Sequence, residues 1–166
     1  MKENKKTELF NHIIDEHKLI LHKVSRAYCP DEDDRKDLIQ EISLQIWRSI
    51  DKYNEEFKIA TWIYRIALNV AISQFRKTSK LKTMPLSTEE HKLEQSETND
   101  DEEKLHMLEH FINELNVLDK ALILLYLEEK SHSEIAEILG ISKSNTGTKI
   151  SRIREKLKQR FYKINI

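Results

Sequence analysis

The chain has 166 residues, of which 39% are hydrophobic and 34% are charged, and it contains only 2 Gly and 2 Pro. So few breaking residues exclude a sandwich or barrel of many short strands, which needs turn residues at close intervals. The single cysteine excludes an intramolecular disulfide and a cysteine zinc cluster. No stretch is apolar enough to span a membrane, and the N-terminus is too polar for a signal peptide. We therefore expect an all-α, cytoplasmic protein that does not insert into membranes.

The net charge of −1 conceals a segregation of charge along the chain. Residues 1–82 carry +3, residues 83–118 carry −8 and residues 119–166 carry +4. Two basic ends separated by an acidic middle favour a polyanionic partner that is contacted twice. Ordinary fluctuation of surface charge explains the pattern about as well, so charge raises nucleic acid as a partner without establishing it.

Three helices are predicted in the first half of the chain. Apolar residues recur at three- and four-residue spacing over about residues 9–28, 31–50 and 59–77, with a loop at 51–58. The pair Cys29-Pro30 ends the first helix, and four acidic residues, 31–34, open the second. A run of carboxylates resembles a metal site, but it also suits the positive end of a helix dipole. Because no second ligand cluster accompanies the run, we expect no metal there.

The middle of the chain loses this periodicity. From Thr78 to about Lys104 it is rich in Glu, Asp, Ser, Thr and Asn, a composition that buries too little apolar area to fold. We expect a flexible acidic linker at 83–103 between two small helical domains, 1–82 and 104–166. Helices resume beyond it, and Asp119 is the expected N-cap of a helix at 121–127. The expected buried face of the helix before it consists of Leu105, Leu108, Phe111, Ile112 and Leu115.

A helix-turn-helix is predicted near the C-terminus. Ser131 and Glu134 have the spacing of a capping box, and Gly140 follows the short helix that they open. Ser142 then caps a longer helix within segment 140–166, which holds eight Lys and Arg residues against one acidic residue. A short helix, a glycine turn and a basic helix form the pattern whose second helix enters the DNA major groove. The competing interpretation is an ordinary solvated basic helix.

The two faces of the basic helix differ in character at about 100° per residue. One face, expected to pack inward, consists of Thr146, Ile150, Ile153, Leu157 and Phe161. The opposite face consists of Ser144, Asn145, Thr148, Lys149, Arg152 and Lys156. Short polar side chains suit base edges and longer basic ones suit phosphates. Gly147 is costly inside a helix, so we expect a close approach there, to nucleic-acid backbone or to the preceding helix.

Two separate parts of the sequence resemble a known family. The sequences DLIQE at 37–41, WR at 47–48 and TWIYRIALN at 61–69 resemble region two of bacterial extracytoplasmic-function sigma factors. The sequences AEILGIS at 136–142 and RIREKL at 152–157 resemble their region four. The resemblance extends over about residues 9–77 and 105–161. It implies a dissociable, non-enzymatic subunit of RNA polymerase, without cofactor or metal, that directs the polymerase to promoters and helps to open the minus-ten element.

The resemblance also implies the sites. The residues expected to dock on core RNA polymerase are Asp37, Gln40, Glu41 and Leu44. Those expected to bind minus-ten DNA are Tyr53, Asn54, Phe57, Lys58, Trp62, Arg65, Asn69 and Arg76. The minus-thirty-five element is assigned to the exposed face of the basic helix, namely Ser144, Asn145, Thr148, Lys149, Arg152 and Lys156. The implied partners are core RNA polymerase, promoter DNA and an anti-sigma factor, and we expect a monomer when the protein is free.

The residues of the minus-ten region are compatible with strand capture. Aromatic residues at 53, 57, 62 and 64 alternate with lysines and arginines, as in surfaces that stack unpaired bases over a basic groove. Core packing explains Trp62 equally well, because it shares a stripe with Ile66 and Val70. The loop carries Glu55 and Glu56 and lacks the Arg-Gly often found there. The sequence therefore does not assign a particular minus-ten base to this loop.

Other functions remain open from the sequence. HMLEH at 106–110 fits a zinc-protease pattern, but its histidines are expected on the solvent face and without a third ligand. A helix-turn-helix repressor would instead form a stable dimer on a palindromic duplex. A helical adaptor without DNA contact would leave the basic face of residues 143–160 unexplained.

Overall fold

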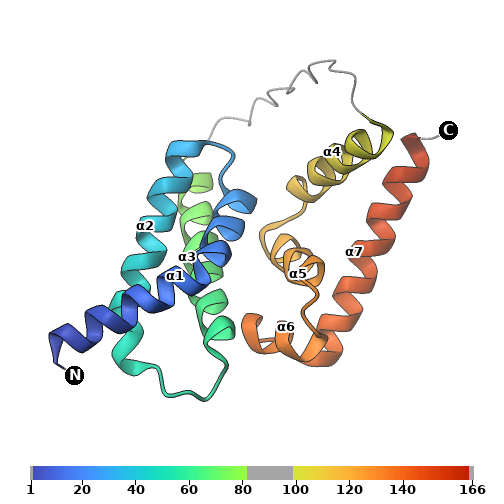
Figure 1. The fold of residues 1–166 in the computed structure, drawn as a ribbon. Coiled ribbons are helices and arrows are strands. Elements are labelled where there is room, and N and C mark those ends of the chain that lie inside the picture. The colour runs from blue at the N-terminus through green and yellow to red at the C-terminus, as the bar shows by residue number, and fades with distance from the viewer. Residues whose placement is uncertain (1, 82–98, 165–166) are drawn as a thin grey trace.

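The computed structural model describes residues 2–81 and 99–164, and every regular element in these ranges is helical (Figure 1). The first range forms α1 (Glu3–Tyr28), α2 (Glu32–Ser49), the short 3-10 helix η1 (Ile50–Lys52) and α3 (Ile59–Leu81). The second forms α4 (Asp100–Asn113), α5 (Val117–Leu127), α6 (His132–Leu139) and α7 (Lys143–Ile164). The all-α prediction is thereby confirmed. None of the described helices is long and apolar enough to cross a membrane.

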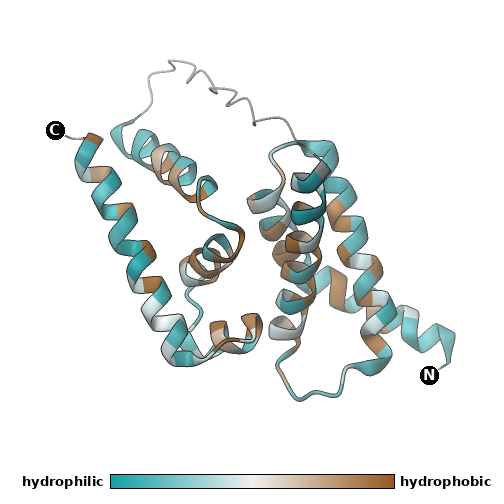
Figure 2. Ribbon diagram, turned by 180° about the vertical axis from the view of Figure 1, so that it is seen from behind, coloured by the Kyte–Doolittle hydropathy of each residue, from teal (hydrophilic) through white to brown (hydrophobic). Residues whose placement is uncertain are grey.

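The first bundle consists of α1, α2 and α3, each packed against the other two. Figure 2 shows hydrophobic stretches where the helices face one another. The fully buried side chains include Ile13, Leu21, Val24, Leu38, Ile42, Ile46, Ile63 and Leu68. Burial of each contributes about 1.5–3 kcal/mol. As predicted, α1 ends at Tyr28 before Pro30 and the acidic run opens α2. The N-cap is Asp31, which accepts a hydrogen bond from the Asp34 N–H at 3.3 Å.

The second bundle places α7 against α4, α5 and α6. Its core contains Phe111, Leu122, Leu125, Ile135, Ile150 and Ile153. The predicted capping box is present: the Glu134 N–H donates to Ser131 Oγ at 3.1 Å, and the Ser131 N–H donates to Glu134 Oε2 at 2.9 Å. That second hydrogen bond holds the pKa of Glu134 below its ordinary value. Gly140 adopts φ 68°, as expected for the residue that ends α6.

Two local predictions about this bundle are wrong. The N-cap of α5 is Asn116, whose Oδ1 accepts the Asp119 N–H at 2.9 Å, because the helix begins one turn earlier than expected. Leu105 is 56% exposed rather than buried, since α4 buries its C-terminal part, around Phe111, and not its first turns. Helix α4 begins at Asp100, inside the segment expected as linker. The rest of that segment, 83–98, lies outside the described residues.

The two bundles are in contact with each other. The Tyr28 hydroxyl donates a hydrogen bond to the Val117 carbonyl at 2.8 Å, and Lys23 pairs with Glu128 at 2.5 Å. Helix α3 packs against both α5 and α6. Figure 1 shows α7 on the side of the second bundle that is remote from α1–α3. The exposed side of α7 is therefore free of the contact between the bundles.

Candidate functional site

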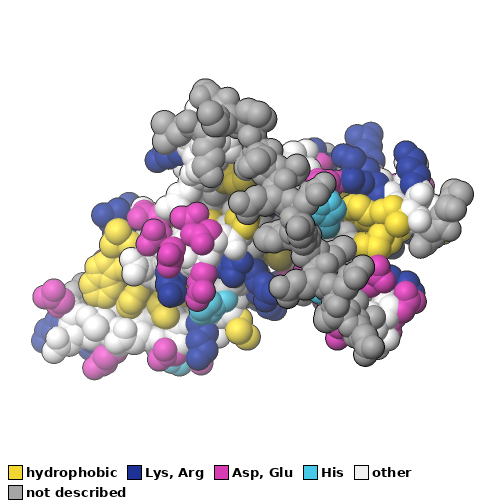
Figure 3. All heavy atoms as spheres, turned by 90° about the horizontal axis from the view of Figure 1, so that it is seen from above, with side chains coloured by type: hydrophobic (Ala, Val, Ile, Leu, Met, Phe, Trp, Pro, Cys, Tyr) yellow, Lys and Arg dark blue, Asp and Glu magenta, His cyan; other side chains and the backbone are white. Residues whose placement is uncertain are grey.

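The face of α2 expected to dock on polymerase is open to solvent. Asp37 and Gln40 are exposed, Leu44 is 40% exposed, and Glu41 is half-buried and accepts a hydrogen bond from Gln45 at 3.2 Å. Figure 3, which looks down on the molecule from above, shows acidic side chains gathered on the first bundle. This face therefore combines negative charge with one apolar side chain that no core contact requires.

A shallow, open groove runs between α2 and α3. Its walls include Glu41 and Gln45 from α2, and Asn69 and Lys77 from α3. Glu41 was expected to contact the polymerase, whereas Asn69 was expected to contact minus-ten DNA. The structure therefore brings together two residues that the sequence assigned to different partners, and the two expected surfaces adjoin along this groove.

The loop between η1 and α3 is closed by its own hydrogen bonds. The Tyr53 hydroxyl donates to the carbonyl oxygen of Phe57 at 2.8 Å. Between them, the Glu56 N–H donates to Asn54 Oδ1 at 3.2 Å, and Glu55 has a left-handed φ of 60°. Asn54 forms a local turn of the kind that Asx side chains favour. The expected minus-ten residues of the loop therefore lie on a defined turn.

The aromatic residues near this loop mostly contact one another. The Tyr53 and Trp62 rings lie 5.0 Å apart, and the Arg65 guanidinium lies 5.0 Å from the centre of the Phe57 ring. Trp62 is half-buried, which is compatible both with packing in the core and with stacking on an unpaired base. Tyr64 is only 3% exposed, and burial raises its pKa to about 12. The expectation that Tyr64 lies among the accessible aromatic residues is wrong, because α3 turns its ring inward.

The expected minus-ten residues of α3 share one stripe. Trp62, Arg65, Asn69 and Arg76 follow one another at three-, four- and seven-residue steps, which keeps them on one side of a helix. Asn69 and Arg76 are exposed, and so is Lys58 in the loop before α3. The stripe begins at Trp62, whose ring packs against Tyr53, and continues along α3 as a row of polar and basic side chains.

The exposed face of α7 agrees with the predicted division of the helix. Ser144, Asn145, Thr148, Arg152 and Lys156 are exposed and Lys149 is half-buried. On the other face, Thr146, Ile150, Ile153 and Leu157 are buried. The predicted cap is present, since the Asn145 N–H donates to Ser142 Oγ at 3.0 Å.

Gly147 marks a close approach of α6 to α7. A Cβ atom at Gly147 would lie 3.3 Å from Nδ1 of His132, at the start of α6. Of the two expected explanations for this glycine, packing against the preceding helix is therefore correct. The absence of a side chain at Gly147 leaves room for the His132 ring beside α7.

The histidines of α4 form no metal site in the described part of the chain. The His106 and His110 side chains are 58% and 69% exposed, as expected for the solvent face. His106 lies 3.8 Å from Glu109, and His110 lies 3.2 Å from Glu114. Among residues 2–81 and 99–164, no group of three or more His, Cys, Asp or Glu side chains is arranged to hold a metal ion.

One contact at the loop has no signal in the sequence. Lys6, near the start of α1, pairs with Asp51 of η1 at 2.7 Å. The two residues are 45 positions apart, so neither helical periodicity nor a local motif connects them. Lys6 is therefore absent from the residues expected at the minus-ten surface, although the adjoining loop is among them.

Comparison with known proteins identifies both halves of the chain. Residues 13–81 match the sigma-70 region 2 family, and residues 105–157 match sigma-70, region 4. RNA polymerase sigma factor SigV of Bacillus subtilis is 30% identical over 87% of this chain and 84% of its own length. The ECF RNA polymerase sigma factor SigW of the same organism is 29% identical over 92% of this chain and 88% of its own length.

Two solved structures share the fold. CnrH, solved in complex with the cytosolic domain of CnrY, has a TM-score of 0.68 at 19% identity, over 93% of this chain and 88% of its own. The sigma factor RpoE of Bartonella quintana was solved with the anti-sigma factor NepR. It has a TM-score of 0.66 at 21% identity, over 87% of this chain and 93% of its own. With both family regions in order and a relative at 30% identity, the chain belongs to the extracytoplasmic-function RNA polymerase sigma factors, which are initiation factors, not enzymes, that direct RNA polymerase to promoters.

Proposed function

We propose that the chain acts in the cytoplasm as a dissociable sigma subunit with three separate contact surfaces. The acidic face of α2 docks on core RNA polymerase, the loop before α3 and the stripe along α3 open and hold the minus-ten element, and the exposed face of α7 binds the minus-thirty-five element. We assign the first two surfaces to a domain of residues 1–82 and the third to a domain that begins with α4 at Asp100 rather than at residue 104, with a linker between the two domains.

The docking surface is supported by its charge and by Leu44. Asp37, Gln40 and Glu41 lie at i, i+3 and i+4 on one side of α2, opposite the buried Ile42 and Ile46. A carboxylate face of this kind complements a basic helix and fixes the register of docking. Leu44 supplies the apolar contact at the same surface, where it is 40% exposed.

The minus-ten surface combines aromatic rings with positive charge. Unpaired bases stack on aromatic side chains while basic groups attract the backbone, and neither interaction requires a particular base. The Tyr53–Trp62 pair supplies the rings. Arg65 and Arg76 supply positive charge along the stripe of α3, and Lys58 supplies it in the loop before the helix. This surface captures the strand that melting releases.

The minus-thirty-five surface is the polar and basic face of α7. Ser144, Asn145 and Thr148 lie near the start of the helix, where a recognition helix contacts base edges. Arg152 and Lys156 follow and suit phosphate contacts. The observation that carries the whole proposal is that this basic face and the acidic face of α2 are exposed on different bundles, so one chain binds polymerase and duplex DNA at once.

We also propose that an anti-sigma factor restrains the free protein, which is a monomer. RpoE, which has the same fold, was solved with its anti-sigma factor NepR. The exposed faces of α2 and α7 are the surfaces that such a partner has to cover to prevent initiation. The free chain has no need of a second copy, because both bundles bury their own cores.

The test is reconstitution with core RNA polymerase. Genomic fragments are transcribed with core enzyme alone and with core enzyme plus the chain, and the transcripts that depend on the chain are mapped. We expect start sites preceded by two short shared elements at fixed spacing, and minus-ten thymines that become reactive to permanganate only in the complete complex. Light scattering of the free chain is expected to give the mass of a monomer.

The helix-turn-helix repressor makes the opposite predictions. It gives a stable dimer, binds a palindromic duplex without polymerase and starts no transcripts. A dimer that protects one palindrome and leaves core polymerase unaffected would therefore overturn the three assigned surfaces.

A further inference from the structure

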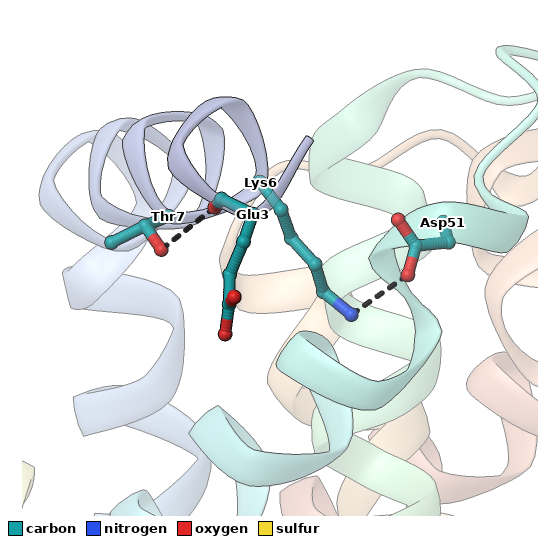
Figure 4. A network of polar contacts seen from close by, with 4 residues as sticks. All are labelled: Glu3, Lys6, Thr7 and Asp51. Carbon is teal, nitrogen blue, oxygen red and sulfur yellow. Dashed lines mark hydrogen bonds and ion pairs between the residues drawn. The ribbon is translucent and has the colours of Figure 1, made fainter. Parts of the chain in front are cut away.

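The N-terminal turn of α1 reaches across the first bundle to the start of the loop. Figure 4 shows the Lys6 side chain pointing at Asp51, with its Nζ 2.7 Å from Asp51 Oδ2. On the same turn, the Thr7 hydroxyl donates to the Glu3 carbonyl oxygen at 3.0 Å. This contact joins the first residues of α1 to η1, the element from which the loop begins.

Lys6 has a second partner on α2. Its ammonium lies 4.6 Å from the centre of the Trp47 ring, and Phe10 packs edge-on against the same ring at 5.3 Å. The Lys6 side chain is 18% exposed, whereas that of Asp51 is 48% exposed. An ammonium held between a carboxylate and an aromatic face, and partly removed from water, interacts more strongly than an ordinary surface pair. Lys6 is thus held facing inward.

Asp51 lies directly before the part of the loop that is closed on itself. The Tyr53 N–H donates to the Ile50 carbonyl at 3.3 Å, which ties the loop to η1. The Tyr53 hydroxyl then donates to Phe57, and the Tyr53 ring lies against Trp62. Tyr53 is thus bonded both to η1 and to the far end of the loop at Phe57. A displacement of η1 therefore displaces Tyr53 and the turn between Tyr53 and Phe57.

We propose that Lys6 is a positioning residue for the minus-ten surface: it fixes η1, and η1 sets where the loop presents Tyr53 and Lys58. This inference rests on the proposed function of the loop. Lys6 does not itself contact DNA, since its ammonium is directed at Asp51 and Trp47. Without it, the bundle core is intact but the loop samples more than one position, and strand capture bears the cost of ordering it.

The experiment compares three single substitutions that each remove one positive charge. Lys6→Met removes the proposed anchor. Lys5→Met is the matched control, because Lys5 is exposed on the same turn of α1. Lys58→Met tests the loop itself. Each full-length variant is assembled with core polymerase, and binding of a fluorescent single-stranded minus-ten oligonucleotide from a reconstituted promoter is measured by anisotropy.

We expect Lys6→Met to weaken capture of the single strand about fivefold, the scale of a partly buried ion pair with a cation–π contact. Lys6→Arg is expected to restore capture, because it keeps the cation. Asp51→Asn is expected to weaken capture similarly, and the double variant with Lys6→Met to weaken it no further, as coupled residues do. Affinity for core polymerase is expected to stay unchanged in all of them.

Each outcome supports or overturns a stated part of the inference. If Lys6→Met behaves like Lys5→Met while Lys58→Met weakens capture, the loop binds the strand but Lys6 does not position it. If neither Lys6→Met nor Lys58→Met changes capture, the proposed function of the loop fails and the inference fails with it. If Lys6→Met lowers core affinity or melts the helices in a circular dichroism spectrum, its role is structural and the positioning role is rejected.

Discussion

The ammonium of Lys120 donates a hydrogen bond to the carbonyl oxygen of Ala27 at 3.2 Å and so joins α5 to the end of α1. Lys120 is only 7% exposed, and its ammonium also lies 5.4 Å from the Tyr28 ring and 6.0 Å from the Phe75 ring. No carboxylate within the described ranges forms an ion pair with it. Burial lowers the pKa of Lys120, so the charged form is disfavoured where it lies.

Replacing this buried charge is expected to stabilise the protein. Lys120→Met keeps most of the side-chain volume, places a thioether beside two aromatic rings and removes the cost of burying an ammonium without a carboxylate partner. We expect the free energy of unfolding to rise by about 1 kcal/mol. Urea unfolding followed by circular dichroism measures it. A loss of stability of the same size would mean that the bond to Ala27 outweighs the burial of charge.

The gain from Lys120→Met is expected to depend on pH. The pKa of Lys120 is lower in the folded chain than in the unfolded chain. Burying its charged ammonium therefore costs the folded state its full free energy at pH values below the folded pKa. This cost diminishes as the pH rises toward 10.5, the ordinary pKa of lysine. The difference between variant and wild type therefore shrinks as the pH rises through the folded pKa of Lys120 toward 10.5. Burial raises the pKa of Tyr28 in both proteins alike. The Cys29 thiolate interacts with the Lys120 ammonium, so the two proteins are compared in a Cys29→Ser background. A pH-independent difference would rule out the charge as its cause.

The contact between Gly147 and His132 predicts a coupling between two substitutions. Gly147→Ala adds helix propensity of about 1 kcal/mol, but its methyl group meets His132 at 3.3 Å. His132 is exposed and has room to rotate, so we expect a gain in stability smaller than the full propensity difference. In a His132→Ala background the full gain of about 1 kcal/mol is expected. Equal gains in both backgrounds, measured by thermal unfolding, would show that the close approach carries no cost.

Local sequence signals predicted the helices and which of their faces are exposed, and long-range contacts account for what these signals missed. The capping box at Ser131 and the glycine turn at Gly140 were predictable because their chemistry acts over a few residues. Burial of Tyr64 was not, because it depends on how α3 is rotated against its neighbours. Lys6 and Lys120 were missed for the same reason, since their partners lie 45 and 93 positions away in the chain.

The docking surface predicts loss of polymerase binding without loss of fold. Asp37→Arg combined with Glu41→Arg reverses the charge of the exposed face of α2, so a basic partner helix is repelled. We expect core binding and transcription to be abolished, while helicity and binding of a minus-thirty-five duplex stay as in the wild type. A pull-down on core enzyme measures the first, and circular dichroism and anisotropy measure the others.

The matched control for that variant is Glu8→Arg with Asp15→Arg. Both residues are exposed on α1, and the change of net charge is the same. This control is expected to retain core binding. If the folded Asp37 and Glu41 variant also binds core polymerase fully, the docking surface lies elsewhere.

The face of α7 predicts a change in salt dependence that is specific to one side of the helix. Lys149 and Lys158 are nine residues apart, which places them on opposite sides of a helix with 3.6 residues per turn. If Lys149 contacts a DNA phosphate, Lys149→Ala lowers the slope of log K against log salt for the minus-thirty-five duplex by about 0.9. Arg152→Ala, on the same side, is expected to lower it by a similar amount.

Lys158→Ala removes the same charge from the opposite side and is expected to leave the slope as it is. This comparison separates a phosphate contact from a general loss of positive charge, because only a contact releases a counterion from the DNA. Anisotropy of a labelled duplex between about 50 and 200 mM salt gives the slopes. Equal slopes for Lys149→Ala and Lys158→Ala would remove the predicted face of α7 from the interface.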